Sequence, residues 1–173
     1  LLLVFWRRYE FRWRGCGAVL LGVAAGLLAF LLWVTPQEAF GVGRRLDGFD
    51  PGALCPWPAA YWSTLAARLV RLVLVVPLLE EVFWRGWLMR RLIAPRFDRL
   101  AFGTFEWRSF VGVAALFAAV HAPADWPAAF LTGLLYNALA CVGRSLGACV
   151  VAHAATNLLL GIYILQTGQW GFW

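Results

Sequence analysis

Long apolar runs separated by short polar segments dominate this chain. A helix needs about 20 apolar residues to cross the roughly 30 Å hydrocarbon core of a bilayer, and most of these runs approach that length. They predict five membrane spans, at about Cys16–Val34, Leu69–Met89, Ser109–His121, Ala128–Val142 and Leu146–Leu165.

The segments between the spans are predicted from their breakers. Thr35 and Pro36 should end the first span, where Gly22 and Gly26 offer close helix packing. The glycine- and proline-rich stretch Gln37–Ala60 should be a loop. Residues 61–68 should form an interfacial stretch before the second span, which Pro77 should kink.

Composition supports a membrane protein and excludes most other classes. The chain is 62% hydrophobic and 14% charged, whereas a soluble domain is about half apolar and a quarter charged. Apolar residues are too abundant for disorder, and four cysteines are too few for a disulfide scaffold. We therefore expect a single all-α domain, a polytopic transmembrane helical bundle over residues 1–173.

The basic residues indicate orientation rather than nucleic-acid binding. All fifteen are arginines, and ten of them gather in alternate loops, whereas Arg44 and Arg45 in the opposite loop are offset by acidic residues. The rich segments hold Arg7, Arg8, Arg12, Arg14, Arg90, Arg91, Arg96, Arg99, Arg108 and Arg144. Positive loops face the cytoplasm, so the C-terminus should be extracytoplasmic. The chain opens on apolar residues 1–6 without Met, which leaves room for one further span before it.

Charged residues stand where they are costly, inside the second span. Each charge at mid-membrane costs about 2.5–3.5 kcal/mol on insertion scales. Glu81 and Arg85 are four residues apart and can pair on one helix face. Glu80 lies about 100° around the helix from Glu81, so that pair leaves it without a structural role.

The two histidines of the chain also lie in predicted spans. Glu80 is ten residues from the next loop arginine, His121 thirteen from the preceding one, and His153 nine from the preceding one. At about 1.5 Å per residue, these depths agree within roughly one helical turn. Asn157 follows His153 by one turn and shares its face. The sequence thus predicts one polar site, built from three helices.

Two kinds of chemistry fit this residue set. A desolvated carboxylate is a suitable general base for water, and an imidazole with an amide can donate to an oxyanion. Alternatively, His121 and His153 with Glu80 could hold Zn²⁺ and leave one position open. No hydroxyl nucleophile is expected, because Thr156 has no evident place beside the histidines. Hydrolysis of a peptide bond in or near the membrane is the interpretation that follows.

The same residues resemble the motifs of a known family. Glu80–Arg85 has the form EExxxR, Phe117–His121 the form FxxxH, and His153–Asn157 the form HxxxN. All three, in this order, are similar to the CPBP family of CAAX proteases and bacteriocin-processing enzymes. The resemblance covers about residues 69–173, the expected protease-like core. The surrounding residues resemble a bacterial subgroup associated with exosortase protein-sorting systems.

This resemblance implies an intramembrane endopeptidase similar to the type II CAAX prenyl endopeptidases. Glu80 would be the general base, with His121 positioning the water. His153 and Asn157 would form the oxyanion site, with Glu81, Arg85 and Phe117 in support. The family is called a metalloprotease family, and the residues leave the need for a metal open. The implied location is the bacterial inner membrane, and the implied substrate is a membrane-anchored protein or peptide.

Two other functions compete with proteolysis. One is a non-enzymatic membrane immunity or partner-binding factor on the same scaffold, which would not require a water-activating set. The other is a proton or ion pathway, which should place ionisable groups at successive depths rather than at one. Neither explains the clustering of Glu80 with both histidines as directly as hydrolysis does.

Overall fold

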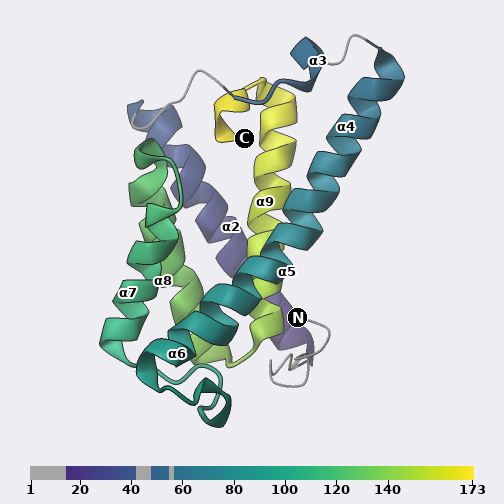
Figure 1. Ribbon diagram of the computed structural model, residues 1–173. Helices are drawn as coiled ribbons and strands as arrows, with labels where there is room; N and C mark the ends of the chain where they lie inside the picture. The colour runs from purple at the N-terminus through teal and green to yellow at the C-terminus, as the bar shows by residue number, and fades with distance from the viewer. Residues whose placement is uncertain (1–14, 42–47, 55–56) are drawn as a thin grey trace.

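The computed structural model describes residues 15–41, 48–54 and 57–173, and within these ranges it consists of helices and loops without strands (Figure 1). The α-helices are α2 (Gly15–Phe40), α3 (Pro51–Leu54), α4 (Pro58–Val70), α5 (Val76–Glu81), α6 (Met89–Ile93), α7 (Trp107–Ala119), α8 (Trp126–Gly143) and α9 (Leu146–Thr167). The π-helical segments are η2 (Arg71–Val75) and η3 (Val82–Leu88), and the 3₁₀ turns are η4 (Phe97–Arg99), η5 (Pro123–Asp125) and η6 (Trp170–Phe172). The predicted all-α class is confirmed.

One long helix runs from Pro58 to Ile93 through α4, η2, α5, η3 and α6. It crosses the bundle obliquely in Figure 1, which suits its 36 residues, well over the number that a perpendicular span needs. The predicted interfacial stretch, residues 61–68, and the predicted span at Leu69–Met89 thus belong to one continuous helix, and the position of the membrane boundary along it stays a prediction. The helix passes Pro77 because the π-helical turn η2, just before it, absorbs the missing backbone hydrogen bond.

The first helix is also longer than expected. Pro36 lies inside α2, which continues to Phe40. Gly41 then adopts a left-handed φ of 64°, and its N–H donates to Gln37 O at 3.0 Å, a glycine cap of the usual kind. The helix therefore ends at this glycine cap and not at Pro36, where the sequence predicted its end. The predicted loop Gln37–Ala60 is corrected accordingly, since it also contains α3 and the start of α4.

Four helices are long and apolar enough to cross a membrane, within the ranges described: Gly15–Phe40, Pro58–Ile93, Pro123–Gly143 and Leu146–Thr167. The predicted third span at Ser109–His121 corresponds to α7, which has 13 residues, rises about 20 Å and is shorter than these four, but runs beside α8 from the arginine-rich end of the bundle toward the opposite end (Figure 1). Its crossing of the membrane stays a prediction. Glu106 caps its N-terminus and accepts from the N–H groups of Ser109 and Arg108, hydrogen bonds that lower the pKa of the Glu106 carboxyl.

Helix α9 packs closely against α2, while α7 packs against α8. Glycines allow the first contact, as the small residues predicted. A Cβ on Gly22 would come 2.7 Å from Ala148 O, and one on Gly26 would come 2.5 Å from Ala152 O. Close backbone approach is a common way for membrane helices to gain van der Waals contact. It holds α9, which carries His153, firmly in the bundle.

Several features expected from the sequence lie outside the described residues. They are the apolar start at residues 1–6 and the arginines Arg7, Arg8, Arg12 and Arg14. The other loop arginines named above, from Arg90 to Arg144, lie at one end of the bundle, the lower end in Figure 1. The C-terminus lies at the opposite end. The two ends thus differ in charge as the orientation prediction requires, while the assignment of each end to a membrane side stays a prediction.

Candidate active site

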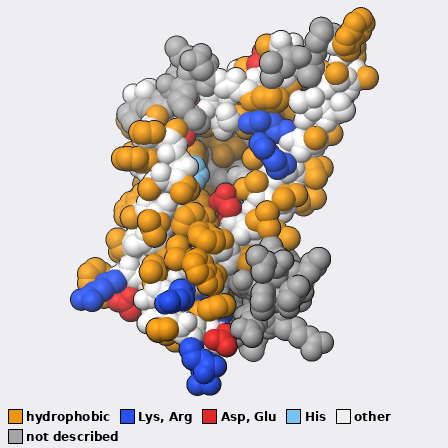
Figure 2. Space-filling model, viewed as in Figure 1, with side chains coloured by type: hydrophobic (Ala, Val, Ile, Leu, Met, Phe, Trp, Pro, Cys, Tyr) orange, Lys and Arg blue, Asp and Glu red, His pale blue; other side chains and the backbone are white. Residues whose placement is uncertain are grey.

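A cavity of about 380 Å³ lies between the helices and receives the predicted catalytic residues. Its walls include Glu80 from α5, Phe117 from α7, His121 just beyond α7, and His153 and Asn157 from α9. Figure 2 shows an acidic and a histidine side chain facing a hollow on this face, among apolar side chains. The structure therefore brings together the residues that the sequence placed at one depth.

The two consecutive glutamates point to different places. Glu80 is half-buried and lines the cavity. Glu81 is fully buried, does not line the cavity, and contacts the side chains of Arg85 and His153. The 100° turn between consecutive helical residues gives each carboxylate its own environment. Glu80 is thus available to substrate and water, whereas Glu81 is available only to other side chains.

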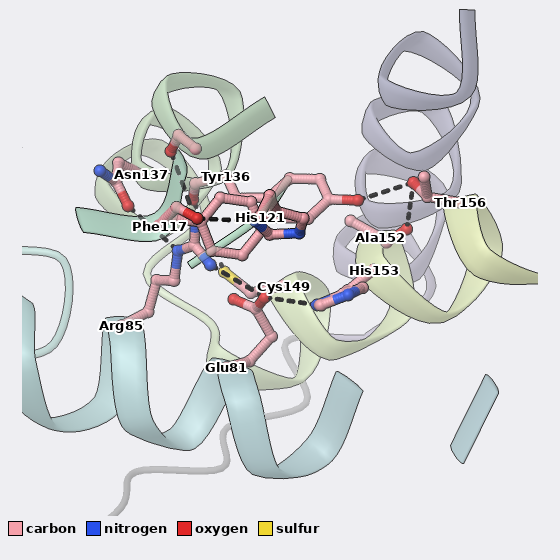
Figure 3. A network of polar contacts seen from close by, with 11 residues as sticks. Glu81, Arg85, Phe117, His121, Tyr136, Asn137, Cys149, Ala152, His153 and Thr156 are labelled. Carbon is pink, nitrogen blue, oxygen red and sulfur yellow. Dashed lines mark hydrogen bonds and ion pairs between the residues drawn. The ribbon is translucent and has the colours of Figure 1, made fainter. Parts of the chain in front are cut away.

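Glu81 joins the long helix to α9. Its Oε1 accepts from Arg85 Nη1 at 3.0 Å, which confirms the predicted i,i+4 pair, and lies 2.9 Å from His153 Nδ1 (Figure 3). Because the carboxylate oxygen already accepts from a guanidinium, His153 Nδ1 is best assigned as the N–H donor. The neutral ring of His153 then has Nε2 as an acceptor, and a doubly protonated ring has Nε2–H as a donor.

Arg85 is only 1% exposed, and its buried guanidinium has a partner on several neighbouring helices. Its Nε donates to Asn137 Oδ1 at 3.0 Å and its Nη2 to Gly133 O at 3.3 Å, both on α8. The ring of Phe117 lies 5.1 Å from its Cζ, close enough for a cation–π contact. Asn137 Nδ2 donates in turn to Phe110 O at 2.7 Å, which extends the network to α7. The buried cation thus fixes three helices around the cavity.

His121 is oriented by its own helix end. Its Nδ1 lies 2.7 Å from Phe117 O, and because a carbonyl can only accept, Nδ1 carries the proton. The neutral ring therefore has Nε2 as a hydrogen-bond acceptor. The rings of Phe117 and Trp33 contact it, with centroids 4.8 and 5.6 Å away. Phe117 is 2% exposed and packs against the histidine, as expected for a supporting residue.

Asn157 is positioned through a backbone carbonyl that Pro77 leaves free. In the π-helical turn η2, Val76 N–H donates to Arg71 O, five residues back. The next bond in that series would run from residue 77 to Leu72 O, but proline has no N–H. Asn157 Nδ2 takes the free carbonyl at 2.7 Å. One N–H and the Oδ1 of the amide remain for a ligand in the cavity.

Thr156 corrects the expectation that no hydroxyl stands beside the histidines. It lines the cavity, and its Oγ1 lies 2.6 Å from Tyr136 Oη, 2.9 Å from Gly26 O and 3.0 Å from Ala152 O. A hydroxyl has one hydrogen to donate, which goes to a carbonyl, so Tyr136 must donate to Thr156. The hydroxyl is occupied in joining α2, α8 and α9, which leaves it unsuited to act as a nucleophile.

Comparison with known proteins identifies the family. The family model described as type II CAAX prenyl endopeptidase Rce1-like matches residues 62–159, more than half of the chain. The chain belongs to this Rce1-like family. No curated protein and no solved structure gives a significant match. The matched segment contains Glu80, Glu81, Arg85, His121, His153 and Asn157, while α2 and the C-terminal turn lie outside it.

The arrangement of donor side chains in this Rce1-like chain bears on whether it could hold a metal ion. No group of three His, Cys, Asp or Glu side chains in the described part of the chain is placed to hold a metal ion. Nδ1 of each histidine is bonded within the protein, that of His121 to a carbonyl and that of His153 to Glu81, which leaves both Nε2 atoms free, as they are in histidines that bind a metal, but no third ligand among the described residues stands with them. The side chains as arranged do not fit the three-ligand zinc site, and the chemistry below is derived from the protein groups alone.

Several lining residues of this Rce1-like site were not predicted. They are Trp33, Asp125, Thr132, Tyr136, Phe172 and Trp173. Asp125 is 4% exposed and comes from the turn η5, a place where an acidic residue looks like an ordinary loop residue. Thr132 accepts from Trp33 Nε1 at 3.0 Å and so ties α8 to α2. Tyr136 and Asn137 could have been predicted as site residues, since they are adjacent polar residues inside an apolar run.

Proposed function

We propose that this protein is an intramembrane endopeptidase that hydrolyses a peptide bond of a membrane-associated protein with glutamate-activated water. The observation that carries the proposal is the convergence of Glu80, His121, His153 and Asn157 on one cavity from three separate helical segments. Membership of a family of prenyl endopeptidases supports it. Since the cavity lies among membrane-spanning helices, its substrate is a membrane-associated chain.

In the first step, Glu80 and His121 bind the attacking water. Glu80 is the carboxylate of the cavity wall and accepts a proton from the attacking water. Nε2 of neutral His121 accepts the other hydrogen of that water and so fixes its orientation, because Nδ1 is held by Phe117 O. The water oxygen bonds to the carbonyl carbon of the peptide, and the carbonyl oxygen becomes an oxyanion.

In the second step, His153 and Asn157 stabilise the oxyanion by donating hydrogen bonds to it. The free N–H of Asn157 donates to the oxyanion. A second proton on His153 gives it an Nε2–H that donates to the oxyanion, while Nδ1–H stays hydrogen-bonded to Glu81. The tetrahedral intermediate then collapses, the C–N bond breaks, and Glu80 returns its proton to the leaving amine. Glu81 and Arg85 act as positioning residues, because they contact His153 and the helices rather than the substrate.

The finer assignments belong to the same proposal. If the arginine-rich end of the bundle is cytoplasmic, the cavity opens nearer the extracytoplasmic end, where Phe172 and Trp173 lie. That geometry suits the processing or sorting of an exported, membrane-anchored protein in a bacterial inner membrane. A membrane immunity or partner-binding factor is the competing function, and it makes no use of Glu80 as a base.

The test is proteolysis by the purified chain in vesicles that also contain candidate membrane-anchored proteins. We expect cleavage by the wild type and losses of at least about 100-fold in Glu80→Gln and His121→Ala, in the range typical of general acid–base groups. Asp98→Asn is the matched control, because it makes the same kind of charge change at an exposed loop position. Each protein is assayed with and without a chelator.

Each outcome decides one question. Cleavage that survives the chelator supports water activation by Glu80 alone, and cleavage lost to the chelator and restored by zinc overturns that mechanism in favour of a metal. If Glu80→Gln cleaves as well as the wild type, Glu80 is not the base. If no variant and no wild-type sample cleaves any candidate, while Glu80→Gln retains full function in cells, the binding-factor hypothesis replaces the protease.

A further inference from the structure

A second, smaller cavity of about 110 Å³ adjoins the catalytic one. It is lined by Arg68, Leu72, Asn157, Leu160, Phe172 and Trp173. All of these residues except Arg68 also line the catalytic cavity. The two spaces therefore form one continuous site, and Arg68 is the side chain that the smaller space adds to it. Figure 2 shows a group of basic side chains near the acidic side chain of the hollow.

Arg68 belongs to the same row of the long helix as the proposed base. Arg68, Leu72, Val76 and Glu80 follow one another at intervals of four residues, and Leu72, Val76 and Glu80 all line the catalytic cavity. Each step of four residues turns about 40° around an α-helix, so neighbours in this series are close while its two ends are joined by the shared lining of the two cavities. Twelve residues at 1.5 Å place Arg68 about 18 Å from Glu80 along the helix axis. The row thus has an acidic end for catalysis and a basic end beside the C-terminal turn.

Among the residues that the structure describes, aromatic rings contact the guanidinium of Arg68 and no counter-ion does. Its Cζ lies 4.3 Å from the ring centroid of Phe49 and 4.9 Å from that of Trp173. Its Nε is buried without a hydrogen-bond partner among the described residues, and no ion pair to it is found there. Arg85, by contrast, has a carboxylate, an amide oxygen and a carbonyl. A stacked guanidinium keeps its N–H edge available for a planar anion.

We propose that Arg68 binds a carboxylate of the substrate peptide at the outer end of the active site. This inference rests on the proposed function, because it assigns a binding position to the same substrate. A carboxylate matches the paired N–H groups of a guanidinium, and Leu160 and Phe172 give the space beside it apolar walls. An extended peptide rises about 3.3 Å per residue, so the carboxylate lies up to about five residues from the cleaved bond.

The carboxylate has two sources within a peptide, an acidic side chain and a free C-terminus. The experiment separates them with fluorescent apolar heptapeptides, in which one Glu or one Gln is placed at each position in turn and the C-terminus is free or amidated. Binding is measured by fluorescence anisotropy to the full chain carrying Glu80→Gln, in neutral phosphatidylcholine vesicles. That variant keeps the peptides intact, so binding is scored independently of hydrolysis.

We expect one acidic position, or the free C-terminus, to strengthen binding about 10- to 100-fold over its neutral twin, as a charged hydrogen-bonded pair would. Adding Arg68→Gln should remove this preference, and Arg68→Lys should keep part of it. Arg71→Gln is the matched control, since it removes the same charge from an exposed position three residues away. It should leave the preference intact. Thermal unfolding of every variant checks that the fold is retained.

Three results overturn the inference. They are an acidic preference that persists without Arg68, a preference lost equally in Arg71→Gln, and an absence of any preference for a carboxylate in the protein that carries Arg68. In the first case, binding to vesicles that contain phosphatidylglycerol is compared with and without Arg68, and a loss in Arg68→Gln makes Arg68 a lipid headgroup site instead. If the preference depends on Arg68 but the wild type cleaves nothing, the carboxylate site stands and the proposed hydrolysis fails.

Discussion

Replacing Glu81 by glutamine should destabilise the protein far more than the same change at Glu80. Glu81 Oε1 is shared by Arg85 at 3.0 Å and His153 at 2.9 Å, and the side chains of Glu81 and Arg85 have no exposed surface. Glu81→Gln keeps the shape of the side chain but leaves the arginine buried without a counter-charge. Breaking a buried ion pair by removing one partner costs about 3–5 kcal/mol.

The size of the effect follows from what remains around Arg85. Asn137 Oδ1 and Gly133 O still accept from it, and the rings of Phe117 and Tyr136 still face its charge. These neutral partners place the expected loss at the lower end of the range, near about 3 kcal/mol, or a factor of about 150 in the folding equilibrium. Such a loss is a large part of the stability of most proteins.

The assay is reversible unfolding in mixed detergent micelles, followed by tryptophan fluorescence, for the wild type, Glu81→Gln and Glu80→Gln. Glu80 is half-buried in the cavity wall and makes no hydrogen bond with the described residues, so its variant should stay within about 0.5 kcal/mol of the wild type. Equal stabilities of the two variants would refute the assignment of Glu81 as the buried counter-ion. A double variant that adds Arg85→Met should recover stability, because it removes the uncompensated charge.

Two further predictions concern the helix contacts. Gly26→Ala should lower the free energy of unfolding by about 1–3 kcal/mol, because its Cβ would come 2.5 Å from Ala152 O, whereas Gly17→Ala, with nothing within 4 Å, should be neutral in the same unfolding assay. Pro77→Ala should cut the cleavage rate about tenfold without loss of stability, because the new N–H competes with Asn157 for its carbonyl. Unchanged cleavage would contradict that reasoning.

The membrane-embedded site was readable from the sequence because charge is so costly in an apolar span. Glu80, His121 and His153 stand out against their neighbours, and counting residues from the loop arginines placed them at one depth. The pairing of Glu81 with Arg85 also followed from helical spacing alone. Each of these inferences uses only the geometry within one helix.

What escaped prediction depends on contacts between helices or on backbone detail. The continuous helix Pro58–Ile93 could not be foreseen, because Arg68 and Pro77 look like interruptions until the rings and the π-helical turn that accommodate them are seen. The same holds for Thr156, whose hydroxyl finds partners on two other helices. The burial of Asp125 could not be predicted, because nothing in the sequence of a short turn distinguishes a buried aspartate from an exposed one.

The N-terminal part of the long helix stands away from the bundle, and this changes how the proposed reaction must be measured. Of the thirteen residues of α4 only Leu65 is buried, while Trp62 and Val70 are 63% and 53% exposed. In a bilayer, acyl chains face these side chains and complete the surroundings of the site. Substrate then arrives by diffusion in two dimensions, and its effective concentration is a mole fraction in the lipid rather than a molarity. Diluting the bilayer with inert lipid should slow the reaction even when the bulk amounts of enzyme and substrate stay constant.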